Sequence, residues 1–111
     1  MLVSYNGLRF DWPILLRRAM YLGVDLRINL DRYRSPHLDL YDVLTARGLT
    51  SAKGLGFYVR RFGWTDLVKP LSGAEEAQVT VTGKWDELAA SVRHDLIACQ
   101  RLAEKLRVIH D

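Results

Sequence analysis

The chain has 111 residues, of which 49% are hydrophobic and 26% are charged, with 16 basic against 13 acidic side chains. This composition is typical of a globular protein and argues against a disordered tail, a collagen-like repeat or a coiled-coil rod. The length suits a single domain over residues 1–111, and the short apolar runs predict no transmembrane helix. We expect a cytoplasmic protein, because the N-terminal residues do not resemble a signal peptide and Cys99 is the only cysteine.

The charge is unevenly distributed along the chain. Residues 1–69 hold 11 Lys/Arg and 6 Asp/Glu, whereas residues 70–111 hold 5 and 7. Arginine dominates the basic part, and its guanidinium suits bidentate contacts with phosphate. An ordinary solvated surface has the same appearance, so charge alone does not identify nucleic acid as a partner.

The first residues predict a strand followed by a tight turn. Residues 2–5 form a short apolar run of strand type, and Asn6-Gly7 ends it with turn chemistry. Such a turn lies at the carboxyl end of a strand, where α/β sheets usually place their sites.

A helix is predicted directly after this turn. Asp11 stands before Trp12-Pro13, a pattern that indicates an N-cap followed by a proline in the first helical turn. Apolar side chains then recur at three-to-four spacing up to Gly23, which we expect to end the helix.

The middle of the chain carries a second strand and a short helix. Residues 24–36 are polar, basic and irregular, residues 37–40 alternate like a strand, and residues 41–44 begin a helical turn. A further helix is expected to be capped by Thr50-Ser51 and to end at Gly63. Residues 78–82 alternate, which predicts a short strand or an extended arm.

The last helix begins at Asp86 and carries a stripe of apolar side chains at helical spacing, namely Leu88, Val92, Leu96, Cys99, Leu102, Leu106 and Ile109. Asp95 falls near the middle of this stripe, where an ionised carboxylate is costly unless it is paired or bound to a cation. Ser91, one turn earlier, lies on the same side, whereas His94 points away.

Two carboxylates, Asp11 and Asp95, are therefore candidate metal ligands. If the two helices pack on one sheet, these oxygens could converge on Mg²⁺ or Mn²⁺, which prefer hard oxygen ligands. The alternatives are a plain helix N-cap for Asp11 and a salt bridge, for example to an arginine, for Asp95. Asp39 is best explained as the cap of the turn that follows it, and the three histidines lack a metal-ligand spacing.

The N-terminal motif resembles a known family. Residues 5–11, Tyr-Asn-Gly-Leu-Arg-Phe-Asp, look like the second motif of DEDD-type 3′–5′ exonucleases of the RNase H-like superfamily. Residues 12–19 extend the likeness to the exonuclease domain of family-B DNA polymerases. Residues 37–44 resemble the next strand of that group, and residues 93–96 resemble its third motif.

This resemblance implies two-metal-ion hydrolysis of a DNA or RNA strand from its 3′ end. It implies Asp11 and Asp95 as catalytic metal ligands, with Mg²⁺ or Mn²⁺ as cofactor. It also implies that Asn6 and Phe10 shape the turn and contact the terminal nucleotide. Arg17 and Arg18 would attract the phosphate backbone, although no motif fixes that role.

The sequence also departs from the family pattern. The first motif, aspartate-x-glutamate on the first strand, occurs nowhere in the chain. Ser91 and Ala90 stand where the third motif has a tyrosine four residues, or a histidine five residues, before its aspartate. Two of the four metal carboxylates and the usual general base are therefore missing.

The expected fold is an incomplete α/β RNase H-like domain, with a short central sheet flanked by helices and a long C-terminal helix. Two short parallel strands are marginal alone and expose an unpaired edge. Three explanations are open: a fragment of a longer protein, a homodimer joined through that edge, or a partner that completes the sheet. The alternative function is a non-catalytic module that binds nucleic acid or protein, and a third interpretation is a small interaction domain.

Overall fold

The computed structural model describes residues 2–27, 34 and 36–107 and divides the chain into two compact units, residues 1–52 and 53–111. Each unit is described by itself. No helix among the described residues is both long and apolar enough to cross a membrane. The structure is α/β, as predicted, with a two-stranded parallel sheet in the first unit.

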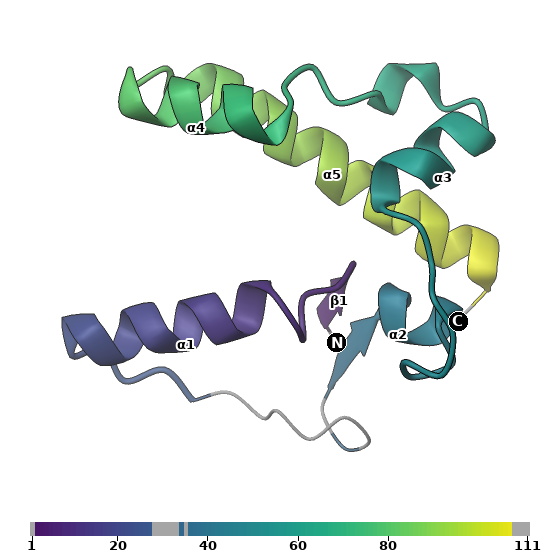
Figure 1. Ribbon diagram of the computed structural model, residues 1–111, viewed down its shortest axis with the longest axis horizontal. Coiled ribbons are helices and arrows are strands. Elements are labelled where there is room, and N and C mark those ends of the chain that lie inside the picture. Colours follow the sequence, from purple (N-terminus) through teal and green to yellow (C-terminus); the bar gives the residue numbers. More distant parts are fainter. Residues whose placement is uncertain (1, 28–33, 35, 108–111) are drawn as a thin grey trace. The chain divides into compact units, whose positions relative to one another are not determined.

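The first unit alternates strands and helices: β1 (Leu2–Ser4), α1 (Asp11–Leu22), β2 (His37–Asp39) and α2 (Leu40–Leu44) (Figure 1). The two strands are parallel, and the register places β1 and β2 side by side over their whole length. Parallel strands require a long crossover, which the α1 segment supplies. The turn after β1 and the start of α2 after β2 therefore lie at the same edge of the sheet.

Helix α1 ends where the sequence predicts but begins differently. Gly23 follows it with a φ of 67°, a left-handed conformation that glycine adopts without strain. The N-cap position is held by Phe10, which makes no side-chain cap, and Asp11 is the first helical residue. The prediction of Asp11 as N-cap was therefore wrong, and its carboxylate is not used to close the helix.

The described part of residues 24–36, namely 24–27, 34 and 36, contains no helix or strand, as expected; the rest of that segment lies outside the described residues. Thr45, fully buried, ends α2 by donating its hydroxyl to the Tyr41 carbonyl at 2.8 Å and accepting the Gly48 amide at 3.1 Å.

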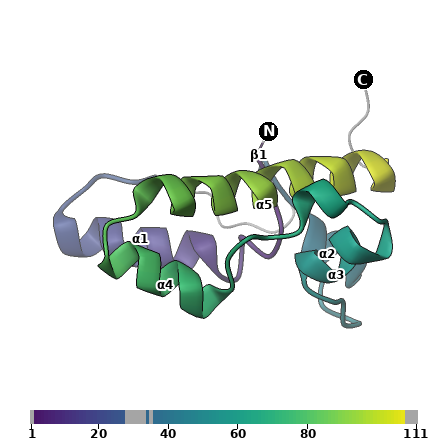
Figure 2. The ribbon, with the colours of Figure 1, turned by 90° about the horizontal axis from the view of Figure 1, so that it is seen from above.

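The second unit is helical, with α3 (Leu55–Arg61), a short 3₁₀ turn η1 (Thr65–Leu67), α4 (Gly73–Val81) and α5 (Trp85–Leu106). Helix α4 lies beside the first half of α5 and α3 beside the second half (Figures 1 and 2). The N-cap of α3 is Gly54, so the expected cap at residues 50–51 was wrong.

Helix α4 occupies the residues for which a strand or extended arm was predicted, and that prediction was wrong. The Ser72 hydroxyl accepts the Glu75 amide at 3.2 Å, which is half of a capping box. Threonines that favour strands are accommodated because Thr80 and Thr82 donate their hydroxyls to carbonyls one turn earlier. Gly83 then ends the helix with a φ of 74°.

The core of the second unit joins three elements. Val59 of α3, Leu67 of η1 and Ala98 of α5 are buried together, and Leu55 and Trp64 pack against them. Burial of these side chains supplies the hydrophobic stabilisation that holds α3 and η1 on α5.

The buried face of α5 differs from the predicted stripe. Cys99 and Leu102 are buried as expected, but Val92 and Leu96 are 45% and 64% exposed. Small residues occupy the contact instead, with Ser91 fully buried beneath α4 and Ala98 in the core. Ile109, the last residue of the predicted stripe, lies outside the described residues.

Candidate functional site

The turn between β1 and α1 is closed by its own backbone. The Phe10 amide donates to the Asn6 carbonyl at 3.1 Å, and the Trp12 amide donates to the Gly7 carbonyl at 2.9 Å. Asn6 adopts a φ of 62°, in the left-handed region that asparagine tolerates better than most residues. The left-handed backbone at Asn6 is part of the geometry that leads the chain from β1 into α1.

Asp39, the last residue of β2, holds the turn from the neighbouring strand. Its carboxylate accepts the Asn6 amide at 2.7 Å and the Leu8 amide at 3.2 Å. It also accepts the Tyr41 amide at 3.0 Å, which is the predicted cap of α2. The residue is only 2% exposed. A buried carboxylate is tolerated here because backbone amides replace the water that it loses.

His37, two residues earlier on the same face of β2, contacts the turn from both ends. One ring nitrogen, Nε2, lies 2.5 Å from Ser4 Oγ, and the Trp12 indole N–H donates to the other, Nδ1. The Gly7 amide donates to the same Ser4 oxygen at 3.2 Å. Burial lowers the pKa of the His37 imidazole below its ordinary value, against the opposing effect of the nearby carboxylates of Asp39, Asp11 and Asp42.

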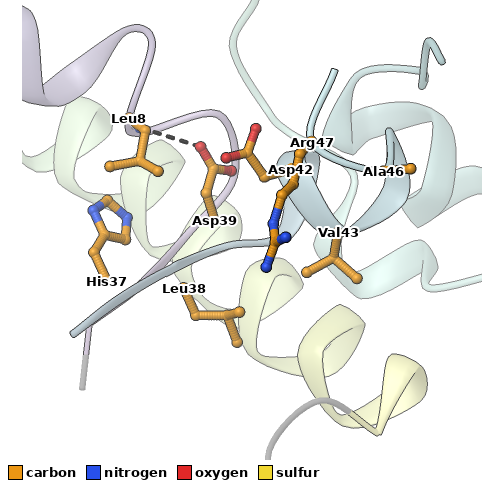
Figure 3. Close-up of a pocket in the computed structure, with 8 residues that line it drawn as sticks. All are labelled: Leu8, His37, Leu38, Asp39, Asp42, Val43, Ala46 and Arg47. Atoms are coloured by element: carbon orange, nitrogen blue, oxygen red, sulfur yellow. Dashed lines mark hydrogen bonds between the residues drawn. The ribbon is translucent and has the colours of Figure 1, made fainter. Parts of the chain in front are cut away.

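A cavity of about 380 Å³ opens beside β2 (Figure 3). It is lined by Leu8, His37, Leu38, Asp39, Asp42, Val43, Ala46 and Arg47. Asp42 is held by an ion pair of 2.8 Å with Arg9, whose guanidinium also lies over the Tyr41 ring. Two acidic side chains and one guanidinium therefore line this cavity, and the dashed line in Figure 3 marks the bond from Leu8 to Asp39.

Asp11 stands in the first turn of α1 with its side chain exposed. Among the described residues it makes no ion pair and no side-chain hydrogen bond. Phe10, beside it, is 61% exposed, and Arg17 and Arg18 are exposed farther along α1. The first unit therefore contains five of the six predicted site residues, and Asp11 presents a carboxylate to solvent.

The Asn6 side chain is turned inward. Its Oδ1 atom is buried and has no hydrogen-bond partner among the described residues. Buried carbonyl oxygens without a partner are uncommon in folded proteins. The amide oxygen of this predicted site residue is thus the one buried side-chain polar atom in the described part of the chain that the fold leaves unsatisfied.

Asp95 belongs to the second unit and is already paired with a cation. Its carboxylate lies 2.9 Å from Lys69 Nζ, which also lies 2.7 Å from Glu76, and Ser91 donates to Glu76 at 2.7 Å. The expected alternative of a salt bridge is confirmed, although the partner is a lysine. The Asp95 side chain is 44% exposed, so its predicted place within a buried stripe was wrong.

The network around Lys69 changes two pKa values. Burial disfavours the charged ammonium, but the hydrogen bonds to Glu76 and Asp95 outweigh it and raise the pKa of Lys69. The hydrogen bond from Lys69 lowers the pKa of Glu76, and the bond from Ser91 acts in the same direction against burial. His94 does not join this network and bonds to its own helix, with Nδ1 2.7 Å from the Ala90 carbonyl.

The described side chains do not form a ready metal site. Nowhere in residues 2–27, 34 and 36–107 do three or more histidine, cysteine or acidic side chains gather in a way that could hold a metal ion. Asp11 and Asp95 have the oxygen chemistry that Mg²⁺ and Mn²⁺ prefer. By themselves, however, they do not provide the coordination that such an ion requires.

Comparison with known families gives the class of this protein. A sequence model of the RNase H superfamily matches residues 1–79, which is more than half of the chain, and the chain therefore belongs to this superfamily. No curated protein and no solved structure matches it. The match covers the strand–turn–helix motif and β2, and Asp95 lies beyond it.

A short two-stranded parallel sheet with its helices is consistent with an incomplete RNase H-like fold. Sequence reasoning missed His37 and Lys69, and it assigned Asp39 only the local cap. The alternation of His37 and Asp39 placed both on one face of β2, but nothing local indicated that this face contacts the preceding turn.

Proposed function

We propose that this chain is part of a metal-dependent 3′–5′ exonuclease that shortens a strand of DNA or RNA. The observation that carries the proposal is the exposed carboxylate of Asp11, at the strand-to-helix turn of a chain that belongs to the RNase H superfamily. The residues of the turn, Asn6 to Asp11, carry the pattern that resembles the second exonuclease motif. No cation of the protein neutralises Asp11 within the described residues, so it is available to a metal ion.

The proposed roles follow the motif residue by residue. Asp11 supplies a metal-binding carboxylate, and Asp95, at the position of the third motif, is a second candidate ligand whose carboxylate is paired with Lys69. Phe10 contacts the terminal nucleotide, for which its exposed ring offers a stacking surface, whereas Asn6, whose Oδ1 is buried, shapes the turn that presents it. Arg17 and Arg18, exposed on α1, attract the phosphate backbone through their positive charge.

A metal ion at Asp11 needs further ligands, from the substrate or from additional polypeptide, because a single carboxylate does not complete a coordination shell. We propose Mg²⁺ or Mn²⁺, since both prefer carboxylate oxygens. When bound, such an ion stabilises charge on the transferring phosphate. The chain's own contribution is to hold the Asp11 carboxylate exposed at a fixed turn.

The small sheet and the exposed apolar side chains of α1 bear on assembly. The sheet has two strands of three residues each among the described residues, and α1 exposes Met20 and Leu22 by 67% and 63%. Such a sheet is marginal in isolation. We propose that additional strands, from a second copy or from another polypeptide, complete it.

The test uses the purified chain with 5′-labelled single-stranded DNA and RNA in Mn²⁺ or Mg²⁺. We expect a ladder that shortens from the 3′ end and disappears in Asp11→Asn. The matched control is Asp25→Asn, because Asp25 is an exposed aspartate outside the motif that, among the described residues, pairs with Arg27 at the surface. A ladder of equal intensity in both variants would exclude Asp11 as the metal-binding residue.

Binding is measured on the same proteins. Paramagnetic broadening by Mn²⁺ should affect the NMR signals around Asp11 in wild type and in Asp25→Asn, and should vanish in Asp11→Asn. Strand binding without cleavage and without Mn²⁺ binding would contradict the exonuclease and identify a non-catalytic nucleic-acid module. Sedimentation at several concentrations reports whether a second copy completes the sheet.

A further inference from the structure

The His37 ring joins three elements of the first unit. It lies on β2, its Nε2 contacts Ser4 Oγ of β1 at 2.5 Å, and its Nδ1 accepts the indole N–H of Trp12 in α1. The Trp12 and His37 rings also meet edge to face, with centroids 5.4 Å apart. Trp12 directly follows Asp11, so this contact is made by the residue next to the proposed metal-binding carboxylate.

The hydrogen bonds determine which form of the imidazole is present. An indole nitrogen can only donate, so Nδ1 must be unprotonated to accept from Trp12. The proton of the neutral ring is then on Nε2, which donates to Ser4 Oγ. A protonated ring would place an N–H against the Trp12 N–H and lose that bond. The contact with Trp12 therefore requires the neutral ring with its proton on Nε2.

The turn itself is fitted to this arrangement. The Gly7 amide donates to the Ser4 oxygen that faces His37, and Gly7 is buried. A Cβ added at Gly7 would lie 2.7 Å from Ser4 Cβ and 3.2 Å from His37 Cε1. These distances are too short for a side chain, so glycine is required by space at this position. Ser4, Gly7 and His37 are thus in close contact with one another beneath the turn.

The charged groups around His37 would by themselves favour the imidazolium. The carboxylates of Asp39 on the same strand, Asp11 on α1 and Asp42 on α2 all act in that direction. Arg47 lines the same cavity, and Arg9 is paired with Asp42. Burial and the Trp12 donor act in the opposite direction. Burial outweighs these carboxylates and lowers the pKa of His37, in agreement with the unprotonated Nδ1 that the Trp12 contact requires.

We propose that His37 is a positioning residue, whose neutral ring connects Ser4 to Trp12 and thereby fixes the first turn of α1 and the direction of the Asp11 carboxylate. The proposal deepens the proposed exonuclease function and rests on it for its catalytic meaning. His37 does not touch substrate in this scheme. It acts through Trp12 and through the turn closed by Ser4 and Gly7.

The primary test is NMR on the full chain labelled with ¹⁵N, and it does not depend on activity. We expect the His37 ¹⁵N shifts of a neutral ring protonated at Nε2, and a Trp12 indole proton that exchanges slowly and is shifted by its bond to Nδ1. A ring protonated at Nδ1, or a Trp12 indole proton that exchanges like that of the exposed Trp85, would overturn the proposal.

Two replacements separate the two ring nitrogens. Asn in His37→Asn keeps a polar group near the Nδ1 position, and Gln in His37→Gln keeps one near Nε2. We expect amide exchange at Phe10 and Trp12 to accelerate at least tenfold in His37→Gln and in Trp12→Phe, and less in His37→Asn. Amides of Thr45 and Trp64, outside the turn, serve as internal references, because a general loss of stability would accelerate them equally and would overturn a positioning role.

The catalytic consequence is measured separately. If the chain cleaves a labelled strand, misplacement of the Asp11 carboxylate should lower cleavage by about 10- to 100-fold in Trp12→Phe, with Trp85→Phe as the matched control. Unchanged cleavage with accelerated turn exchange would overturn the catalytic meaning of the positioning. If the wild-type chain neither cleaves nor binds Mn²⁺, the proposed function fails, whereas the NMR result still decides whether His37 fixes the turn.

Discussion

In the unit of residues 1–52, the carboxylate of Asp39 is buried and accepts three backbone amides, whereas in the unit of residues 53–111 the carboxylates of Glu76 and Asp95 share the ammonium of Lys69. In the first unit the charge is balanced by the backbone, and Asp11 remains exposed. In the second, the predicted metal-binding carboxylate is itself part of the ion pair. Asp11 and Asp95, the two predicted metal ligands, therefore differ in how readily a cation can reach them.

The largest effect should come from the two fully buried leucines. Leu40→Ala in the first unit and Leu102→Ala in the second should each lower the free energy of unfolding by about 2–5 kcal/mol. Thermal unfolding followed by NMR signals of each unit tests the prediction that residues 1–111 form a single domain. A single domain loses both sets of signals together in either variant, whereas separate melting of the two sets would contradict it.

The second effect concerns the Asp39 carboxylate, which accepts three backbone amides. Asp39→Ala leaves three backbone amides without their acceptor and should lower the free energy of unfolding by about 2–3 kcal/mol. Asp39→Asn retains one oxygen acceptor and should fall between this variant and wild type. Chemical denaturation measures both. If Asp39→Ala instead lowers the free energy of unfolding by less than about 0.5 kcal/mol, the turn closes without the Asp39 carboxylate.

The third effect separates the units by pH. The pKa of His37 is lowered in the folded state, so the unfolded chain binds the extra proton first, and the free energy of unfolding falls as pH drops below about 6.5. The lowered pKa of Glu76 means that its contribution to the free energy of unfolding is lost only as pH drops below about 4.5. The raised pKa of Lys69 means that its contribution is lost at strongly alkaline pH.

The three tryptophan indole signals report this difference, because Trp12 lies in the first unit and Trp64 and Trp85 lie in the second. We expect the Trp12 signal to change first on acidification and to lose this early change in His37→Asn. An early change that persists in His37→Asn would contradict the assignment of this step to His37.

The smallest effect belongs to the lysine network. Lys69→Met removes the cation between Glu76 and Asp95, whose side chains are 24% and 44% exposed, and should lower the free energy of unfolding by about 1 kcal/mol or less. Lys84→Met, at an exposed lysine, is the control. Lys69→Met should also increase Mn²⁺ binding if Asp95 is a metal ligand, because the competing ammonium of Lys69 is gone. Unchanged Mn²⁺ binding would separate Asp95 from the metal site.

Local patterns predicted most of the first unit. The apolar run before Asn6-Gly7, the proline in the first turn of α1 and the terminal Gly23 each act over a few residues, so the sequence alone indicates them. The same approach failed at residues 78–82, where alternating threonines suggested a strand. The capping signal of Ser72 and Glu75 was the better local guide, and it was overlooked.

The candidate site was predicted less completely than the fold. Asp11 and Asn6 were found from the motif, because their spacing is local. The roles of His37 and Asp39 require that β2 lie beside β1 in a particular register, and no spacing within one strand specifies this. The pairing of Asp95 with Lys69 connects residues on different elements, so it could not be read from the stripe on α5.

By itself, the sequence determined the α/β class, the strand–turn–helix motif that carries Asp11, and the long last helix. These features depend on side-chain periodicity and on the conformational preferences of glycine, proline and asparagine, which act within single elements. Only the tertiary structure decided which carboxylates have hydrogen-bond or ion-pair partners. Asp39 is satisfied by amides of a neighbouring turn and Asp95 by a lysine from another segment, whereas Asp11 stays exposed, because these outcomes depend on which distant groups the packing brings within hydrogen-bond distance.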